Sequence, residues 1–293
     1  MMYIDSHCHI NFPELNNNID DVLSNMKDNS ISHALCVSVT LDNYQSVLKL
    51  AEAHNHIFAS VGVHPDYEDI EEPDVEILTR HAKNANVVAI GETGLDYFRL
   101  KGELLWQKDR FRTHIRAAIE SDLPLIIHTR NAREDTIKIM KEEKAFNARG
   151  VMHCFTETYE MAKQAIDQDF YISFSGIITF KNAEELRETV KKIPLDRILI
   201  ETDSPYLAPV PNRGKLNEPA NVVYVAKKIA EIRRLLWEEV AETTTKNFFN
   251  LFSKCQTSYI ISVVLVLELQ WSVVNVVHVN QIIKKIIERV VQV

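Results

Sequence analysis

The stretch Val87-Val88-Ala89-Ile90-Gly91-Glu92 places a carboxylate directly after a run of apolar, partly β-branched residues. A run of this kind, without a polar face, is typical of a parallel strand that is buried on both sides. Seven other segments have the same character, at residues 3–9, 34–39, 58–64, 125–128, 150–154, 171–175 and 198–203. Together with 87–92, the sequence therefore predicts eight buried strands.

The segments between these runs have the apolar spacing of amphipathic helices. Three stripes illustrate it: Ile19, Val22, Leu23 and Met26; Phe111, Ile115, Ala118 and Ile119; and Leu186, Val190 and Ile193. Eight alternating strand–helix units predict an α/β fold of the (β/α)8 TIM-barrel type. A doubly wound open sheet is the competing arrangement, but no Gly-x-Gly-x-x-Gly motif follows the first predicted strand.

Composition limits the possible functions. The chain has 293 residues, 46% hydrophobic and 25% charged, which is enough for one barrel domain or two smaller domains. Its formal net charge is −8, so its whole surface is not built to bind nucleic acid, and a polyanionic substrate needs a local basic patch or metal ions. The four cysteines are too scattered for a disulfide framework and no signal peptide is apparent, so we expect a cytoplasmic protein.

Six side chains of the types that bind metals stand at the ends of five predicted strands. They are His7, His9, Glu92, His128, His153 and Asp203. His7 and His9 are two residues apart on a strand and project from the same face, whereas Cys8 points the other way. Because the carboxyl ends of barrel strands surround one pocket, the set predicts a single metal centre and a barrel of the metal-dependent hydrolase type.

Each of these residues also has a purely structural interpretation. A lone histidine after an apolar run is more often a hydrogen-bonded core residue. The flanking glycines would also fit an exposed Glu92 just past its strand, and Asp203 would also cap a turn with Ser204 and Pro205. Asp5 is expected either to orient a ligand or to accept a backbone amide. We favour one built site over six separate coincidences.

Longer motifs surround these residues. They are Asp5-Ser6-His7-Cys8-His9, Gly62-Val63-His64-Pro65, Gly91-Glu92-Thr93-Gly94-Leu95-Asp96-Tyr97, His128-Thr129-Arg130, His153-Cys154-Phe155, Ser173-Phe174-Ser175-Gly176, Glu201-Thr202-Asp203-Ser204-Pro205-Tyr206, Arg213-Gly214-Lys215-Leu216-Asn217-Glu218-Pro219 and Asn247-Phe248-Phe249. Over about residues 1–255, the chain strongly resembles the TatD-type deoxyribonuclease family. The resemblance implies a metal-dependent hydrolase that cleaves DNA, often as an exonuclease, and we expect single strands or chain ends as substrate.

The resemblance also implies two divalent metal ions, which would be Mg²⁺, Mn²⁺ or Zn²⁺. The first would be held by His7, His9, Glu92 and Asp203, and the second by Glu92, His128 and His153, with Glu92 as the bridge. Asp203 and Glu92 would be the catalytic carboxylates, and we expect Asp203 to accept a proton from the attacking water. His64 would lie at the rim of the same pocket and contact the substrate.

Three basic residues follow the fifth and eighth predicted strands: Arg130, Arg213 and Lys215. We expect them to contact phosphate groups, although solvated loop charge explains them equally well. The aromatic residues Tyr97, Phe98 and Tyr206 would stack on bases or simply pack. One motif departs from the family pattern, because Thr156-Glu157-Thr158 stands where a turn like Ser-Gly-Ser is usual. We expect Glu157 to add a negative charge near the pocket mouth.

Two other functions stay open. One is hydrolysis of an ester or amide bond, such as the deacylation of aminoacyl-tRNA, because the same activated water serves both chemistries. The other is a non-enzymatic protein that binds a membrane or a partner through the end of the chain. The complete ligand set argues against this second function.

The composition changes after residue 255, and we predict a barrel domain over residues 1–255 and an apolar extension over 256–293. Residues 259–279 are rich in valine and isoleucine, and residues 280–293 have the spacing of an amphipathic helix. We expect the extension to pack or to self-associate, giving a monomer or a tail-mediated oligomer. A membrane span is disfavoured because Glu268 and Gln270 would lie near its middle. An aberrant, aggregation-prone extension is the remaining alternative.

Overall fold

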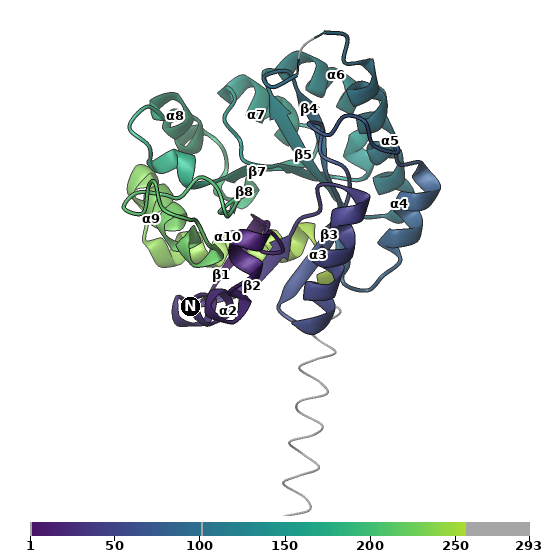
Figure 1. The fold of residues 1–293 in the computed structure, drawn as a ribbon. Coiled ribbons are helices and arrows are strands. Elements are labelled where there is room, and N and C mark those ends of the chain that lie inside the picture. Colours follow the sequence, from purple (N-terminus) through teal and green to yellow (C-terminus); the bar gives the residue numbers. More distant parts are fainter. Residues whose placement is uncertain (1, 101, 256–293) are drawn as a thin grey trace, which may run out of the picture. The chain divides into compact units, whose positions relative to one another are not determined.

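The computed structural model describes residues 2–100 and 102–255, and the residues up to Phe252 form one compact unit. This unit contains a sheet of eight parallel strands in the order β1 to β8, surrounded by helices (Figure 1). The strands are β1 (Tyr3–Cys8), β2 (Ile31–Cys36), β3 (Ile57–Val61), β4 (Val87–Asp96), β5 (Leu125–Arg130), β6 (Gly150–Met152), β7 (Phe170–Phe174) and β8 (Ile198–Ile200). The predicted TIM barrel and its eight strands are confirmed.

Helices follow the strands along the chain. They are α1 (Pro13–Asn16), α2 (Ile19–Asp28), α3 (Leu41–Ala53), α4 (Val75–Ala82), α5 (Leu105–Ser121), α6 (Arg133–Glu142), α7 (Tyr159–Ile166), α8 (Glu184–Lys192), α9 (Val222–Arg233) and α10 (Trp237–Leu251). Threonine or aspartate caps three of them at the amino end: Thr40, Asp74 and Thr158 each accept a hydrogen bond from a backbone amide three residues on. The three predicted apolar stripes lie on α2, α5 and α8, except that Ile193 directly follows the end of α8.

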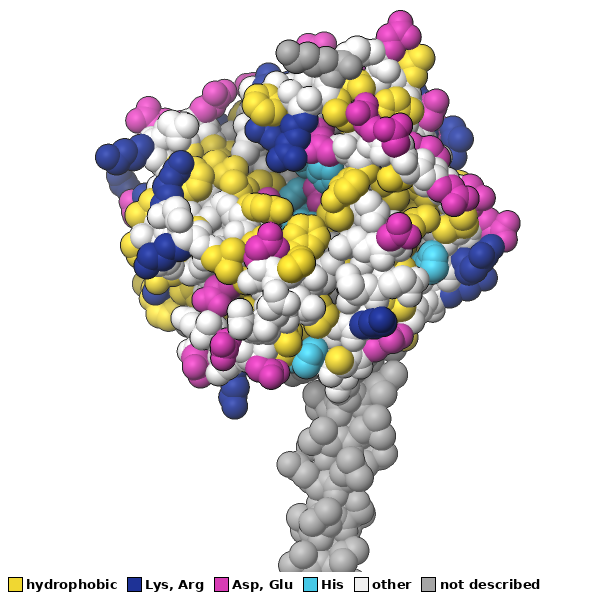
Figure 2. Space-filling view, in the orientation of Figure 1, with side chains coloured by type: hydrophobic (Ala, Val, Ile, Leu, Met, Phe, Trp, Pro, Cys, Tyr) yellow, Lys and Arg dark blue, Asp and Glu magenta, His cyan; other side chains and the backbone are white. Residues whose placement is uncertain are grey.

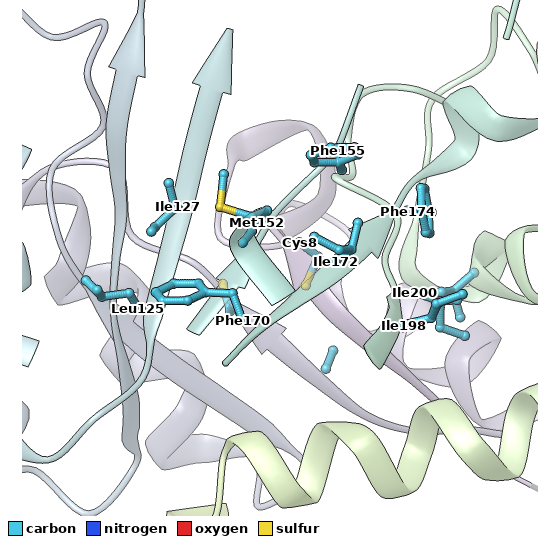
Figure 3. Close-up of a cluster of buried hydrophobic side chains, with 14 of the residues drawn as sticks. Cys8, Leu125, Ile127, Met152, Phe155, Phe170, Ile172, Phe174, Ile198 and Ile200 are labelled. Carbon is cyan, nitrogen blue, oxygen red and sulfur yellow. The ribbon is translucent and has the colours of Figure 1, made fainter. Parts of the chain in front are cut away.

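Side chains pack tightly where the strands meet. Leu125, Met152, Phe170, Ile172 and Ile198 come from the four strands β5 to β8, and each has no exposed surface (Figure 3). Burial on this scale, on both faces of the strands, explains why the strand runs carry so few polar residues. The polar residues of the strands are therefore concentrated at the carboxyl ends.

The last strand returns to the first and nearly closes the barrel. A parallel bridge joins Cys8 to Ser204. The backbone amide of His9 donates to the carbonyl of Ser204 (2.7 Å), and the amide of Asp203 donates to the carbonyl of His7 (3.0 Å). The hydrogen bonds that close the barrel thus involve the same residues that we predict as metal ligands.

Asp5 adds hydrogen bonds between β1 and the residues that follow β8. One carboxylate oxygen accepts the backbone amides of Thr202 (2.8 Å) and His7 (3.3 Å), and the other accepts the Thr202 hydroxyl (2.5 Å). Of the two roles expected for Asp5, the structure shows the acceptor of backbone amides. Because β8 ends at Ile200, these hydrogen bonds from Thr202 to Asp5 hold the chain after β8 against β1 where strand pairing is absent.

Strand β4 is longer than predicted, and Gly94 explains why. Gly94 has φ of +136°, and a Cβ there would lie 2.0 Å from the carbonyl oxygen of His128. Only glycine lets β4 pass so close to β5, so the strand continues to Asp96. Glu92 consequently lies inside the strand and is buried, and the alternative of an exposed glutamate beyond the strand end is wrong.

The predicted extension over residues 256–293 lies outside the described residues. Within residues 2–100 and 102–255, no helix combines the length and the apolar character that crossing a bilayer requires. The four cysteines are free thiols.

Gly94→Ala is expected to lower the free energy of unfolding by at least about 2 kcal/mol, because the added methyl group strains the backbone and meets the carbonyl of β5. Gly214→Ala is the matched control, since Gly214 also has a positive φ but has open space around it. It should lose only about 1 kcal/mol, from the backbone term alone. Denaturant unfolding of both variants measures the difference. Equal losses would mean that the close approach of the two strands is not what requires glycine.

Candidate metal centre

A pocket of about 740 Å³ opens at the carboxyl ends of the strands. Its wall contains five of the six predicted ligands, and the sixth, His7, is almost completely buried. In Figure 2 the pocket is the hollow in which histidine and acidic side chains lie behind hydrophobic ones. The structure therefore brings all six residues together in one place.

Four atoms that could bind a metal form a first group on one side of the pocket. The Nε2 atoms of His7 and His9 are 3.2 Å apart. The Nε2 atom of His7 is 3.4 Å from Glu92 Oε2, and that of His9 is 3.5 Å from Asp203 Oδ1. Ligands bound about 2 Å from one ion lie roughly 3 Å from each other. This mixture of imidazole nitrogen and carboxylate oxygen, with these spacings, fits a divalent cation.

A second group surrounds the other oxygen of Glu92. Glu92 Oε1 is 2.9 Å from His153 Nε2, 3.1 Å from His128 Nδ1 and 3.3 Å from His64 Nε2. His64, expected at the pocket rim, thus reaches the centre of the site as well. Oε2 of Glu92 therefore faces one group of potential ligand atoms and Oε1 faces the other.

The imidazoles determine the charge state of the carboxylates. Burial alone would raise the pKa of Glu92, but His153, His64 and His128 hold it well below its ordinary value. The pKa of Asp203 is also lowered, because contacts with the neighbouring histidines, above all His9, outweigh its burial. Both groups are therefore ionised at neutral pH and available to a cation.

In three histidines, the ring nitrogen that faces away from the ligand groups, here called the outer nitrogen, makes a hydrogen bond. His9 Nδ1 donates to the Val37 carbonyl (2.9 Å), His153 Nδ1 to Glu201 (3.0 Å) and His128 Nε2 to Asp96 (3.0 Å). In metal-binding histidines, an acceptor of this kind orients the ring so that its inner nitrogen faces the ion. Burial opposes the charged form of these three imidazoles, but the carboxylates around them raise the pKa of each, so a bound cation would take the place of a proton on the inner nitrogen.

Asp96 and Glu201 were assigned no role from the sequence, although both lie in the quoted motifs. Glu201 is two residues before Asp203, so strand periodicity could have placed both on the same face. Nothing in the sequence pairs Asp96 with His128, because that contact depends on the pairing of β4 with β5. One oxygen of Glu201 and His7 Nδ1 are buried without a hydrogen-bond partner.

The predicted basic residues separate into two groups. Arg130 lines the pocket and stacks on the exposed ring of Phe98, 3.8 Å from its centroid. Arg213 and Lys215 are exposed and are not among the residues that line this pocket. The sequence analysis missed Arg99, which also lines it. Figure 2 shows basic side chains at one edge of the hollow.

One expectation about the pocket mouth needs correction, and the structure favours one of the two alternatives for Tyr97. Glu157 is buried and accepts two hydrogen bonds from Arg133, at 2.7 and 3.0 Å, so it does not add an unpaired negative charge. Tyr97 donates its hydroxyl to Asp135 (2.8 Å) and serves packing rather than the pocket. Tyr206, in contrast, is exposed and lines the pocket.

Comparisons with known proteins agree with this geometry. A family model described as "TatD related DNase" matches residues 4–253. The chain is 46% identical over 255 residues to the uncharacterized metal-dependent hydrolase YcfH of Escherichia coli, covering 86% of this chain and 96% of that protein. It is 42% identical over 252 residues to the uncharacterized metal-dependent hydrolase YabD of Bacillus subtilis, covering 86% and 99%.

Solved structures have the same fold. The TatD homologue YjjV of Escherichia coli superposes with a TM-score of 0.80 at 27% identity, covering 86% of this chain and 98% of that one. A TatD-family hydrolase of Entamoeba histolytica gives 0.75 at 25% identity, with coverage of 86% and 98%. An organophosphorus hydrolase gives 0.60 at 13% identity, covering 85% and 92%, which shows a shared fold alone.

Glu201→Gln is expected to weaken the binding of divalent metal by about 10- to 100-fold, because the amide no longer offers His153 Nδ1 a charged acceptor. Titration calorimetry with Mn²⁺ measures the change. Glu188→Gln, at an exposed position on α8, is the control and should bind Mn²⁺ like the wild type. Unchanged affinity in Glu201→Gln would show that His153 needs no carboxylate to be oriented.

Proposed function

The chain belongs to the family of TatD related DNases, whose relatives here are metal-dependent hydrolases, and from this premise we propose that it hydrolyses phosphodiester bonds of DNA at a two-metal centre. The observation that carries the proposal is the placement of Glu92. Its two carboxylate oxygens face two separate groups of ligand atoms. A carboxylate that offers one oxygen to each of two ligand groups would suit a pair of divalent cations, which would supply charge stabilisation for displacement at a phosphodiester.

The ligand assignment follows the two groups. His7, His9, Glu92 and Asp203 would hold one ion, and Glu92, His128 and His153 the other. What divalent ions supply when bound here is polarisation of a phosphoryl oxygen and a lowered pKa for a water molecule.

Asp203 is the residue that we assign as proton acceptor. It is ionised, and its side chain is 17% exposed, whereas that of Glu92 is only 3% exposed. Asp203 can therefore be reached by a water molecule in the pocket, while Glu92 is enclosed by imidazoles. A carboxylate in this position would take the proton that the attacking water loses.

The pocket mouth supports a nucleic acid with unpaired bases. Arg99 and Arg130 line the pocket and would contact phosphate groups. Tyr67, Phe98 and Tyr206 are exposed near these arginines, where bases that are not stacked in a duplex can stack on them. Two arginines in a protein of net charge −8 make a local contact rather than a long basic track. We therefore assign single strands or frayed chain ends as the substrate.

The test is cleavage of a labelled single-stranded DNA oligonucleotide with and without Mg²⁺ or Mn²⁺. The wild type should cleave only with metal, and chelation followed by added metal should stop and restore cleavage. Asp203→Asn should keep the fold and lower the rate by about 10²–10⁴-fold, since it removes the proton acceptor and a ligand charge. Asp196→Asn, at an exposed position, should cleave like the wild type. Asp203→Asn activity close to the wild type would mean that another group takes the proton.

A parallel assay on aminoacyl-tRNA separates the alternative. Deacylation without cleavage of DNA, under the same metal conditions, would replace the proposed reaction with ester hydrolysis. Cleavage of DNA without deacylation would exclude that alternative.

Binding of single-stranded DNA to Asp203→Asn should weaken only gradually with salt. Two arginine–phosphate contacts predict a slope of about −1.4 for the logarithm of affinity against the logarithm of salt concentration. Fluorescence anisotropy at several salt concentrations measures it. A slope of about −4 or steeper would require a more extended basic surface than Arg99 and Arg130 provide.

A further inference from the structure

His64 differs from the other histidines of the site in its outer hydrogen bond. The backbone amide of Asp66 donates to His64 Nδ1 at 3.0 Å. A neutral imidazole has one nitrogen that donates and one that accepts. Because Nδ1 accepts, the proton of neutral His64 is on Nε2, the atom that faces Glu92 Oε1 at 3.3 Å. In His9, His128 and His153, the outer nitrogen instead faces a carbonyl or carboxylate oxygen and donates to it.

The alternative partner of His64 Nδ1 is too distant. The nearer carboxylate oxygen of Asp66 is 4.0 Å from Nδ1, beyond hydrogen-bond distance, and Arg99 pairs with that same oxygen at 3.2 Å. The Asp66 amide is therefore the group that determines which nitrogen of His64 bears the proton.

Helix α5 holds the segment that carries His64. Three of its buried polar side chains bind consecutive backbone groups of that segment: His114 Nε2 accepts the amide of Val63 (3.0 Å), Arg110 donates to the carbonyl of His64 (2.9 Å), and Gln107 donates to that of Pro65 (3.1 Å). Burial lowers the pKa of His114 to about 4, so its ring stays neutral and keeps accepting. The segment is fixed residue by residue, and with it the amide of Asp66.

From these contacts we propose that His64 is not a metal ligand but a fixed hydrogen-bond donor, which presents its Nε2–H to the phosphate of the substrate. This inference rests on the proposed hydrolysis of phosphodiesters. As the phosphate reacts, negative charge grows on its oxygens, and a donor that is already oriented in a buried pocket stabilises it. His64 keeps its proton throughout this role. Arg110 acts as a positioning residue, because it binds the carbonyls of His64 and Tyr67 and the carboxylate of Glu72 and is not among the residues that line the pocket.

The first test counts metal ions and needs no substrate. Calorimetric titration and elemental analysis with Mn²⁺ should show that His64→Ala binds as many ions as the wild type, each with affinity within about threefold. His128→Ala, which removes an assigned ligand, should lose one ion or weaken it by at least about tenfold. A similar loss in His64→Ala would make His64 a ligand and overturn the proposal.

The second test follows the rate of cleavage. His64→Ala should lower kcat by about 10²–10³-fold with little change in KM, the loss that follows removal of a donor from a preorganised site. His64→Gln, whose side-chain amide also offers an N–H, should recover about tenfold of this. Equal rates for the two variants would exclude a hydrogen-bond donor at this position. If the wild type does not cleave DNA at all, the proposed function fails, and the metal count still decides whether His64 is a ligand.

A third comparison isolates the role of α5. Arg110→Lys should lower kcat by about 10- to 100-fold without loss of metal, because a shift of the segment moves the donor. Arg116→Lys, on the same helix and paired with Glu143 at the surface, should have no effect. Adding Arg110→Lys to His64→Ala should cause little further loss, since both changes remove the same donor. Losses that multiply would show that Arg110 acts on catalysis independently of His64.

Discussion

A buried carboxylate is stable only among groups that offset its charge. Glu92 is such a carboxylate, and the side chains at the carboxyl ends of the barrel strands surround it. Imidazoles from four different strands or their following loops lie around the two oxygens of this one side chain. The glycine at position 94 continues β4 past Glu92 and holds it against β5, so that His128 is within reach. The position of Glu92 between the two groups of potential ligand atoms therefore depends on the pairing of β4 with β5 as well as on the side chains themselves.

The sequence could predict the barrel because its strands are buried on both faces, which leaves runs such as Leu125-Ile126-Ile127 with no helical or alternating pattern. The six candidate ligands were recognisable for the same reason, since each interrupts or ends an apolar run. Strand ends were less predictable. Glycine usually weakens a strand, but Gly91 and Gly94 permit the close approach of β4 to β5 that lets β4 continue.

Contacts made only by the folded chain were not predictable. The burial of Gln107, Arg110 and His114 on α5 depends on the β3–α4 segment that packs over them, and helical periodicity shows only the apolar residues beside them. The charge of Glu157 was visible in the sequence, but its partner Arg133 lies on a different helix. Arg213 and Lys215 illustrate a different case: their positions in a motif indicate phosphate contacts, but neither is among the residues that line the pocket, so that prediction stays untested.

The contacts between β1 and the residues that follow β8 determine when, during synthesis of the chain, the six candidate ligands can come together. The hydrogen bond between Asp5 and Thr202 joins residues 197 positions apart, and the first and last ligands stand beside it. At a translation rate of about 5–20 residues per second, His7 is incorporated roughly 10–40 seconds before Asp203. A nascent or truncated chain therefore has histidines but no complete metal centre. The six side chains can therefore come together only after nearly the whole barrel has been synthesised.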